Sequence, residues 1–197
     1  EHYNLYSYVN DELPALVEST FAGTILGGSK SISGHSMGGH GAITLALKNP
    51  GTYTSVSAFS PITHPTSCPW GTKAFSGYLG SVEAGAAHDA SLLCKSYAGP
   101  PMKILVDQGA ADNFLIGEVN QLQPDALKEA CAASGGTASP AAGRARRAAA
   151  AASAPCAAAA CGSDDVSSLS RAASESFAFM FCVAVRDGRL RPTTRPL

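Results

Sequence analysis

Ser36 is the residue whose surroundings most clearly indicate chemistry. It lies at the centre of Gly34-His35-Ser36-Met37-Gly38, a G-x-S-x-G sequence with a glycine two positions before and two positions after the serine. A serine on a sharp turn projects its hydroxyl into a cleft, and small residues at these two positions let neighbouring backbone pass close to the turn. The pattern therefore predicts a nucleophilic serine that attacks an acyl carbon.

The segments around this motif predict the strand, turn and helix that it requires. Short apolar stretches bounded by turn residues are strand candidates at residues 29–33, 54–60 and 102–107. Residues 42–48 carry apolar side chains at helical spacing until Asn49-Pro50-Gly51, and a second helix is expected from about Pro124. We therefore expect an α/β protein with a mostly parallel sheet flanked by helices, a partial α/β-hydrolase fold.

A nucleophilic serine needs groups that stabilise charge and move a proton. On this fold the helix after the turn makes the backbone N–H of Met37 available to an oxyanion. The orienting acid is expected in the loop after a later strand, where Asp107 closes the strand and Asp112 lies within the loop. Position favours Asp112 slightly, because Asp107 could equally be a structural residue that caps the loop.

The histidine base is the element that the sequence does not supply. In this fold the acid precedes the histidine, yet all five histidines precede Asp112, at positions 2, 35, 40, 64 and 88. His35 and His40 flank the nucleophile but are not expected to reach it as a general base, and His35 is instead a candidate for shaping the substrate cleft. His64 and His88 are interpreted as surface or loop residues.

Composition excludes several classes of partner. A net charge of -1 and a pI near 6.6 give no electrostatic reason to bind nucleic acid or an acidic membrane surface. No stretch approaches the roughly 18 apolar residues of a membrane span, and the cysteine and histidine spacing shows no zinc pattern. We expect a soluble protein without a zinc site, whose cysteines are free thiols in a reducing cytoplasm.

The chain divides near Cys131 into two parts of unlike composition. All six lysines precede Cys131 and all eight arginines follow it, and half of residues 131–162 are alanine. Such a segment cannot build a packed core. We therefore assign residues 1–131 to the partial hydrolase domain and residues 132–197 to a low-complexity, disordered tail, within which apolar residues 177–183 are compatible with one strand.

Several stretches of the first part resemble the S-formylglutathione hydrolase family, also called the esterase D family. The matching stretches are residues 34–42, 46–50, 55–61 and, most specifically, 68–80, which contains Cys68-Pro69-Trp70-Gly71. Weaker matches extend the resemblance to about residues 3–131. It implies Ser36 as nucleophile, Asp112 as triad acid and the Met37 N–H as an oxyanion donor, with His35 and Trp70 as candidates for the substrate pocket.

The resemblance also implies an activity, which is cytosolic hydrolysis of S-formylglutathione to formate and glutathione without metal or cofactor. The partner is then a small glutathione thioester, and a homodimer is a further expectation. A general carboxylesterase or acyltransferase on the same fold and a non-catalytic remnant stay open as alternatives.

Two family features have no counterpart in this sequence: an N-terminal region with the second oxyanion donor, and a Gly-Tyr-Asp-His-Ser segment with the catalytic histidine. We therefore expect a fragment whose C-terminal end is mistranslated or mis-spliced. Without the histidine its catalysis should be impaired, and without the N-terminal strands one edge of the parallel sheet should be unpaired.

Overall fold

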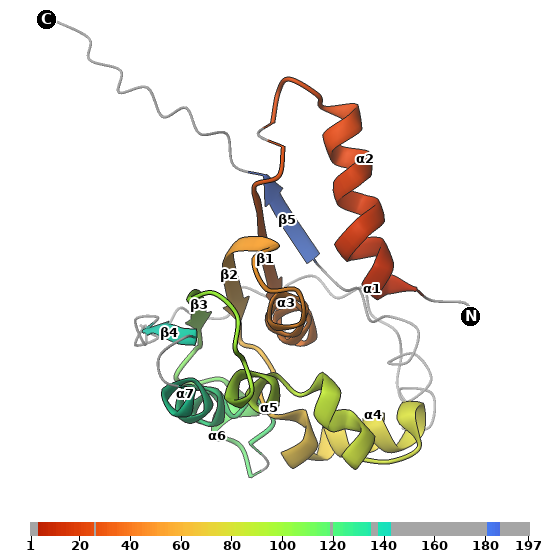
Figure 1. The fold of residues 1–197 in the computed structure, drawn as a ribbon. Helices are drawn as coiled ribbons and strands as arrows, with labels where there is room; N and C mark the ends of the chain where they lie inside the picture. The colour runs from red at the N-terminus through yellow and green to blue at the C-terminus, as the bar shows by residue number, and fades with distance from the viewer. Residues whose placement is uncertain (1–3, 26, 119, 135–137, 143–180, 186–197) are drawn as a thin grey trace, which may run out of the picture.

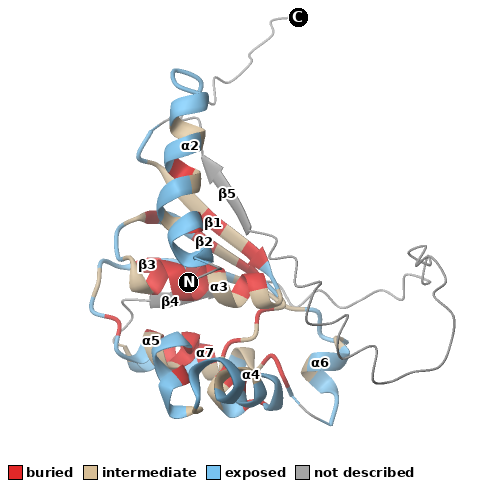
Figure 2. Cartoon of the chain, turned by 90° about the vertical axis from the view of Figure 1, so that its right-hand side faces the viewer, coloured by how far each residue is buried: buried red, intermediate tan, exposed pale blue. Residues whose placement is uncertain are grey.

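The computed structural model describes residues 4–25, 27–118, 120–134, 138–142 and 181–185. The chain starts with a nearly continuous helical segment, formed by α1 (Leu5–Ser7), the π-helical turn η1 (Tyr8–Glu12) and α2 (Leu13–Thr20). Figure 1 shows α2 extending away from the layer that contains α4 to α7. Most residues of the whole segment from α1 to α2 are exposed (Figure 2). Within it only Val9 and Pro14 are buried, so the segment contributes little to the core.

A five-stranded sheet in the order β4-β3-β2-β1-β5 organises the rest of the chain. The strands are β1 (Lys30–His35), β2 (Tyr53–Phe59), β3 (Met102–Asp107), β4 (Ala138–Ala142) and β5 (Phe181–Val185). The pairs β1–β2, β2–β3 and β3–β4 are parallel, whereas β5 runs antiparallel to β1. The predicted α/β class with a mostly parallel sheet is confirmed.

Helices and short turns connect these strands. They are α3 (Met37–Lys48), η2 (Pro65–Ser67), α4 (Pro69–Leu79), η3 (Glu83–His88), α5 (Ala90–Lys95), α6 (Asn113–Ile116) and α7 (Pro124–Ala133). Helix α3 packs on β1 and β2, α7 lies beside β4, and α5 packs against both α3 and α7. Because β1, β2 and β3 are parallel, their carboxyl ends meet at one edge of the sheet, where ligands of open α/β sheets bind.

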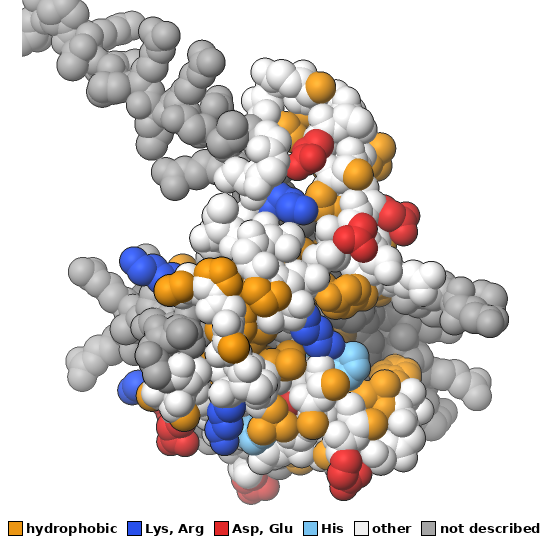
Figure 3. Space-filling model, viewed as in Figure 1, with side chains coloured by type: hydrophobic (Ala, Val, Ile, Leu, Met, Phe, Trp, Pro, Cys, Tyr) orange, Lys and Arg blue, Asp and Glu red, His pale blue; other side chains and the backbone are white. Residues whose placement is uncertain are grey.

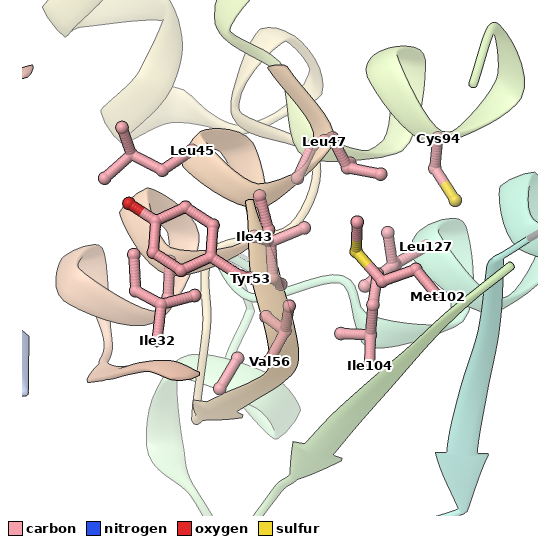
Figure 4. Close-up of a cluster of buried hydrophobic side chains, with 14 of the residues drawn as sticks. Ile32, Ile43, Leu45, Leu47, Tyr53, Val56, Cys94, Met102, Ile104 and Leu127 are labelled. Carbon is pink, nitrogen blue, oxygen red and sulfur yellow. The ribbon is translucent and has the colours of Figure 1, made fainter. Parts of the chain in front are cut away.

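The core lies between one face of the sheet and these helices. Ile32, Val56 and Ile104 occupy register-matched positions of β1, β2 and β3, and each is at most 1% exposed. Ile43 and Leu47 of α3 cover them (Figure 4). Burying side chains of this size removes apolar surface from water and contributes about 1.5–3 kcal/mol for each.

The opposite face of the central strands is polar. Ser31 pairs with Ser55 across β1 and β2, and their hydroxyl oxygens are 2.7 Å apart. Leu105 on the same face of β3 is 36% exposed. The described helices therefore bury one face of these strands and leave a serine-rich face more open.

Two features of the C-terminal segment differ from a featureless tail. Strands β4 and β5 both lie within residues 132–197, and β5 overlaps the apolar stretch 177–183. Since β5 forms ladder hydrogen bonds with β1, the expectation of an unpaired edge there is wrong. The Ala-rich residues 143–180 lie outside the described residues, so the domain boundary at 131 stays a prediction.

Candidate active site

Ser36 occupies the strained turn that the motif predicts. It follows the last residue of β1 and precedes the first residue of α3, with φ 53° and ψ -117°. Non-glycine residues in such sparsely populated backbone regions cost about 1–3 kcal/mol and cluster at active sites. A Cβ at Gly34 would overlap the carbonyl of Gly38, so the close passage of these two backbone segments requires glycine. The side chain of Ser36 is half-buried.

The N-terminus of α3 provides hydrogen-bond donors next to this serine. The Ser36 side chain does not cap the helix, and the N–H of Met37 is one of those that an α-helix leaves without an intrahelical acceptor. The helix dipole places partial positive charge at the same point. Met37 therefore has the position that an oxyanion donor requires.

Asp112 lies in the loop after β3, at the edge of the sheet that carries Ser36. Its Oδ1 accepts a hydrogen bond from the N–H of Phe114 at 2.9 Å and so caps α6, and its Oδ2 accepts one from Gln108 Nε2 at 3.3 Å. Gln108 Oε1 is buried and has no hydrogen-bond partner among the described residues. The Asp112 carboxylate is thus held in place by two hydrogen bonds from nearby residues of the chain.

Asp107 is held differently. It is the last residue of β3, and its carbonyl oxygen accepts from the N–H of Ser60 at 2.8 Å. No side-chain hydrogen bond joins Ser36 to either aspartate within the described ranges. The acid assignment therefore stays a prediction.

Trp70 and His35 border the same edge. The Trp70 ring, 43% exposed, packs against Phe114 with ring centroids 4.8 Å apart. Gln121 Oε1 accepts from the Trp70 backbone N–H at 3.2 Å. Trp70 is therefore tied to the loop that contains Asp112, and exposed His35 directly precedes the nucleophile.

Two histidines have partners other than Ser36. His40 donates from Nδ1 to the Ile62 carbonyl at 2.9 Å, and burial lowers the pKa of its imidazole. His88 Nδ1 lies 3.0 Å from Lys48 Nζ, and burial and this ammonium lower the pKa of His88. His2 lies outside the described residues.

His64 forms a pair that the sequence interpretation missed. Its Nδ1 lies 2.9 Å from Oδ2 of Asp89, a carboxylate with no exposed surface. Asp89 also accepts from the backbone and hydroxyl of Thr66 and from the N–H groups of Ser91 and Leu92 at the start of α5. Burial raises the pKa of Asp89, but the hydrogen bonds from Thr66, Leu92 and His64 outweigh it and hold the pKa below its ordinary value.

This pair has a structural explanation. Asp89 caps α5 and anchors the chain around His64, so the imidazole is bound to a helix cap. The sequence could have predicted the cap, because an aspartate directly precedes the helix. It could not have predicted the contact with His64, which lies 25 positions earlier in the chain.

Comparison with known proteins identifies the family. The model of the family named Esterase matches residues 1–139. The chain belongs to the esterase family. The chain is 53% identical over 131 residues to S-formylglutathione hydrolase of Rattus norvegicus and 52% identical over 131 residues to that of Bos taurus. In both comparisons the match covers 66% of this chain and 45% of the relative.

A solved structure supports the fold of this chain. The S-formylglutathione hydrolase of Agrobacterium tumefaciens superposes with a TM-score of 0.62 and 42% identity, over 72% of this chain and 48% of the other. The expected hydrolase fold is confirmed by this match, as is the resemblance to S-formylglutathione hydrolases. The chain spans about half the length of the relatives it matches.

The face of the molecule in Figure 3 shows no dominant charge. Figure 3 shows acidic and basic side chains scattered among apolar ones on the face it presents. Among the described residues, no group of three or more histidine, cysteine or acidic side chains is arranged to hold a metal ion. In the same residues no helix is both long and apolar enough to cross a membrane.

Proposed function

We propose that Ser36 is the nucleophile of a serine thioesterase that hydrolyses S-formylglutathione to formate and glutathione, with carboxylesterase activity toward small activated esters. The backbone of Ser36 carries this proposal, because a serine at positive φ between a parallel strand and a helix is the geometry of an acyl-transfer nucleophile. The relatives named S-formylglutathione hydrolase support the substrate class.

In the proposed reaction the Ser36 hydroxyl attacks the formyl carbon while a histidine base takes its proton. The oxyanion accepts a hydrogen bond from the Met37 N–H, and the glutathione sulfur leaves with the proton. Water then attacks the formyl ester, which releases formate and restores the serine. Asp112 orients the imidazole, and Trp70 and His35 contact the substrate.

The base is the component that this polypeptide lacks. His40, His64 and His88 bind other groups, and no histidine follows Asp112 in the sequence. We therefore propose that the 197-residue chain by itself is strongly impaired, and that the activity belongs to a chain with a suitably placed histidine.

A chimera tests the proposed substrate. The matched 131 residues of this chain would replace their counterparts in the rat S-formylglutathione hydrolase. We expect the folded chimera to cleave S-formylglutathione and p-nitrophenyl acetate. Cleavage of the ester alone would make this region that of a general carboxylesterase, and loss of both activities in a folded chimera would indicate a non-catalytic remnant.

Cellular location and assembly are further proposals. We place the protein in the cytoplasm, because glutathione maintains the reducing poise of that compartment. A small thioester is the proposed partner, rather than nucleic acid or membrane. The expected homodimer is checked by sedimentation of the purified chain.

A further inference from the structure

Cys94 and Cys131 bring two thiols together in the core, away from the strained serine. Cys94 belongs to α5 and Cys131 to α7, two helices that pack against each other. Their sulfur atoms are 2.7 Å apart, and each residue is at most 1% exposed. Figure 4 shows Cys94 projecting from α5 into the cluster that contains Met102 and Leu127.

We propose that Cys94 and Cys131 are a site of oxidative modification, at which a small peroxide converts the two thiols into a disulfide that joins α5 to α7. Disulfide sulfurs lie about 2.05 Å apart, so the two atoms need to approach by well under 1 Å. A small movement of two short helices is enough for this approach.

The reaction balances with hydrogen peroxide as the two-electron oxidant. The thiolate of one of the two cysteines attacks one peroxide oxygen, the O–O bond breaks, and protonation of the departing oxygen gives water and a sulfenic acid. The sulfur of the other cysteine then attacks the sulfenic sulfur, forms the S–S bond and expels hydroxide, which takes up the proton of that second thiol to give water. Two thiols and one peroxide thus become one disulfide and two waters.

The contact between the thiols favours a thiolate at one of them. The two sulfur atoms are close enough for one thiol to donate to a negative charge on the other. Either sulfur can therefore attack the peroxide first, and its neighbour then attacks the sulfenic acid.

Cys68 provides the internal comparison. It is also buried, but burial raises the pKa of its thiol and no second sulfur lies beside it among the described residues. A peroxide should therefore act on the α5–α7 pair before it acts on Cys68.

The disulfide would constrain the part of the chain that carries β3 and Asp112, because residues 94–131 would form a closed loop. Cross-links that close loops stabilise proteins largely by restricting the unfolded chain. We therefore expect oxidation to raise the Tm of the full chain by about 5 °C or more.

Peptide mapping of the full 197-residue chain tests the proposal. The reduced protein is treated with hydrogen peroxide, its remaining thiols are blocked with N-ethylmaleimide, and the digest is analysed without reductant. We expect a linked peptide pair containing Cys94 and Cys131, lighter than the two reduced peptides by two hydrogen atoms. The same treatment in guanidinium should remove the preference for this pair, because unfolding separates the thiols.

Variants supply a second readout. Cys68→Ala is the matched control, and it should keep both the linked peptide and the rise in Tm on oxidation. Cys94→Ala and Cys131→Ala should each abolish the rise. Linkages that favour Cys156, Cys161 or Cys182, oxidation to sulfinic acids alone, or unreacted thiols in the folded chain would each overturn the proposal. The mapping of the unsubstituted chain decides the matter even if a variant does not fold.

Discussion

Ser36 donates its backbone N–H to the carbonyl oxygen of Phe59 at 2.8 Å. This bond continues the β1–β2 ladder by one residue beyond His35, so the turn starts from a point fixed by the neighbouring strand. Because Ser36 also has positive φ, its backbone places the side chain at the carboxyl edge of the sheet. The proposed nucleophile is therefore preorganised by the backbone of the turn.

Substitution of Gly34 by alanine should destabilise this turn. The added Cβ would overlap the Gly38 carbonyl, a backbone group that cannot move aside without shifting the start of α3. We expect a loss of about 2 kcal/mol or more in the free energy of unfolding, measured by urea denaturation.

Gly77→Ala is the matched control for that experiment. Gly77 lies within α4 and a Cβ there would meet nothing within 4 Å, so alanine should leave stability unchanged or raise it by about 0.5–1 kcal/mol. Similar losses at both positions would contradict the role assigned to the close contact at Gly34.

Substitution of each aspartate near β3 by asparagine in the chimera tests which of the two is the triad acid. Asp112→Asn should lower kcat on the order of ten-thousand-fold, because the base loses its orienting carboxylate. Stability should change little, since asparagine can still accept from the Phe114 N–H and cap α6. Asp107→Asn should retain most of the turnover. Equal or reversed losses of kcat, measured with S-formylglutathione, would overturn the choice of acid.

Asp89 should contribute stability that depends on pH. Its folded-state pKa is below the ordinary value, so the contribution is fully present above about pH 4 and is lost as the pH falls through the folded pKa. Asp89→Ala removes the acceptor of several hydrogen bonds and should cost about 3 kcal/mol at pH 7. Urea unfolding of both proteins should show this difference narrowing toward pH 3, and a constant difference would exclude an ionised Asp89.

The 197-residue chain alone should be nearly inactive. Loss of the histidine base from a serine hydrolase costs on the order of a million-fold in turnover. Esterase assays on monomeric protein check this expectation with p-nitrophenyl acetate, and Ser36→Ala controls for hydrolysis elsewhere on the surface. A Ser36-dependent rate within about a hundredfold of a typical enzyme's 10 per second would show that a base is present after all.

Local sequence predicted the strands better than the helix beside the nucleophile. Residues 102–107 matched β3 at both ends, because an apolar run between turn residues is a local signal. The helix was expected to begin at Ala42 but begins at Met37. Gly38 and Gly39 look like turn residues, and only their close packing against Gly34 and Pro61 explains glycine within a helix.

Contacts between distant residues could not be predicted from local patterns. The antiparallel pairing of β5 with β1, the His64–Asp89 pair and the approach of Cys94 to Cys131 all depend on tertiary packing. At the candidate site the sequence predicted Ser36, Met37 and the loop of Asp112, since each follows directly from a strand end. The sequence also shows directly that no histidine follows Asp112, because this depends only on the order of residues.

The most direct test of the central claim compares Ser36→Ala with Ser60→Ala in the chimera. Both serines follow strand ends at the same edge and both have positive φ, but only Ser36 directly precedes a helix. Turnover of S-formylglutathione is followed for each folded variant. We predict that Ser36→Ala lowers kcat by at least about ten-thousand-fold while Ser60→Ala stays within a few-fold of the unsubstituted chimera. Undiminished turnover by Ser36→Ala would contradict its assignment as the nucleophile.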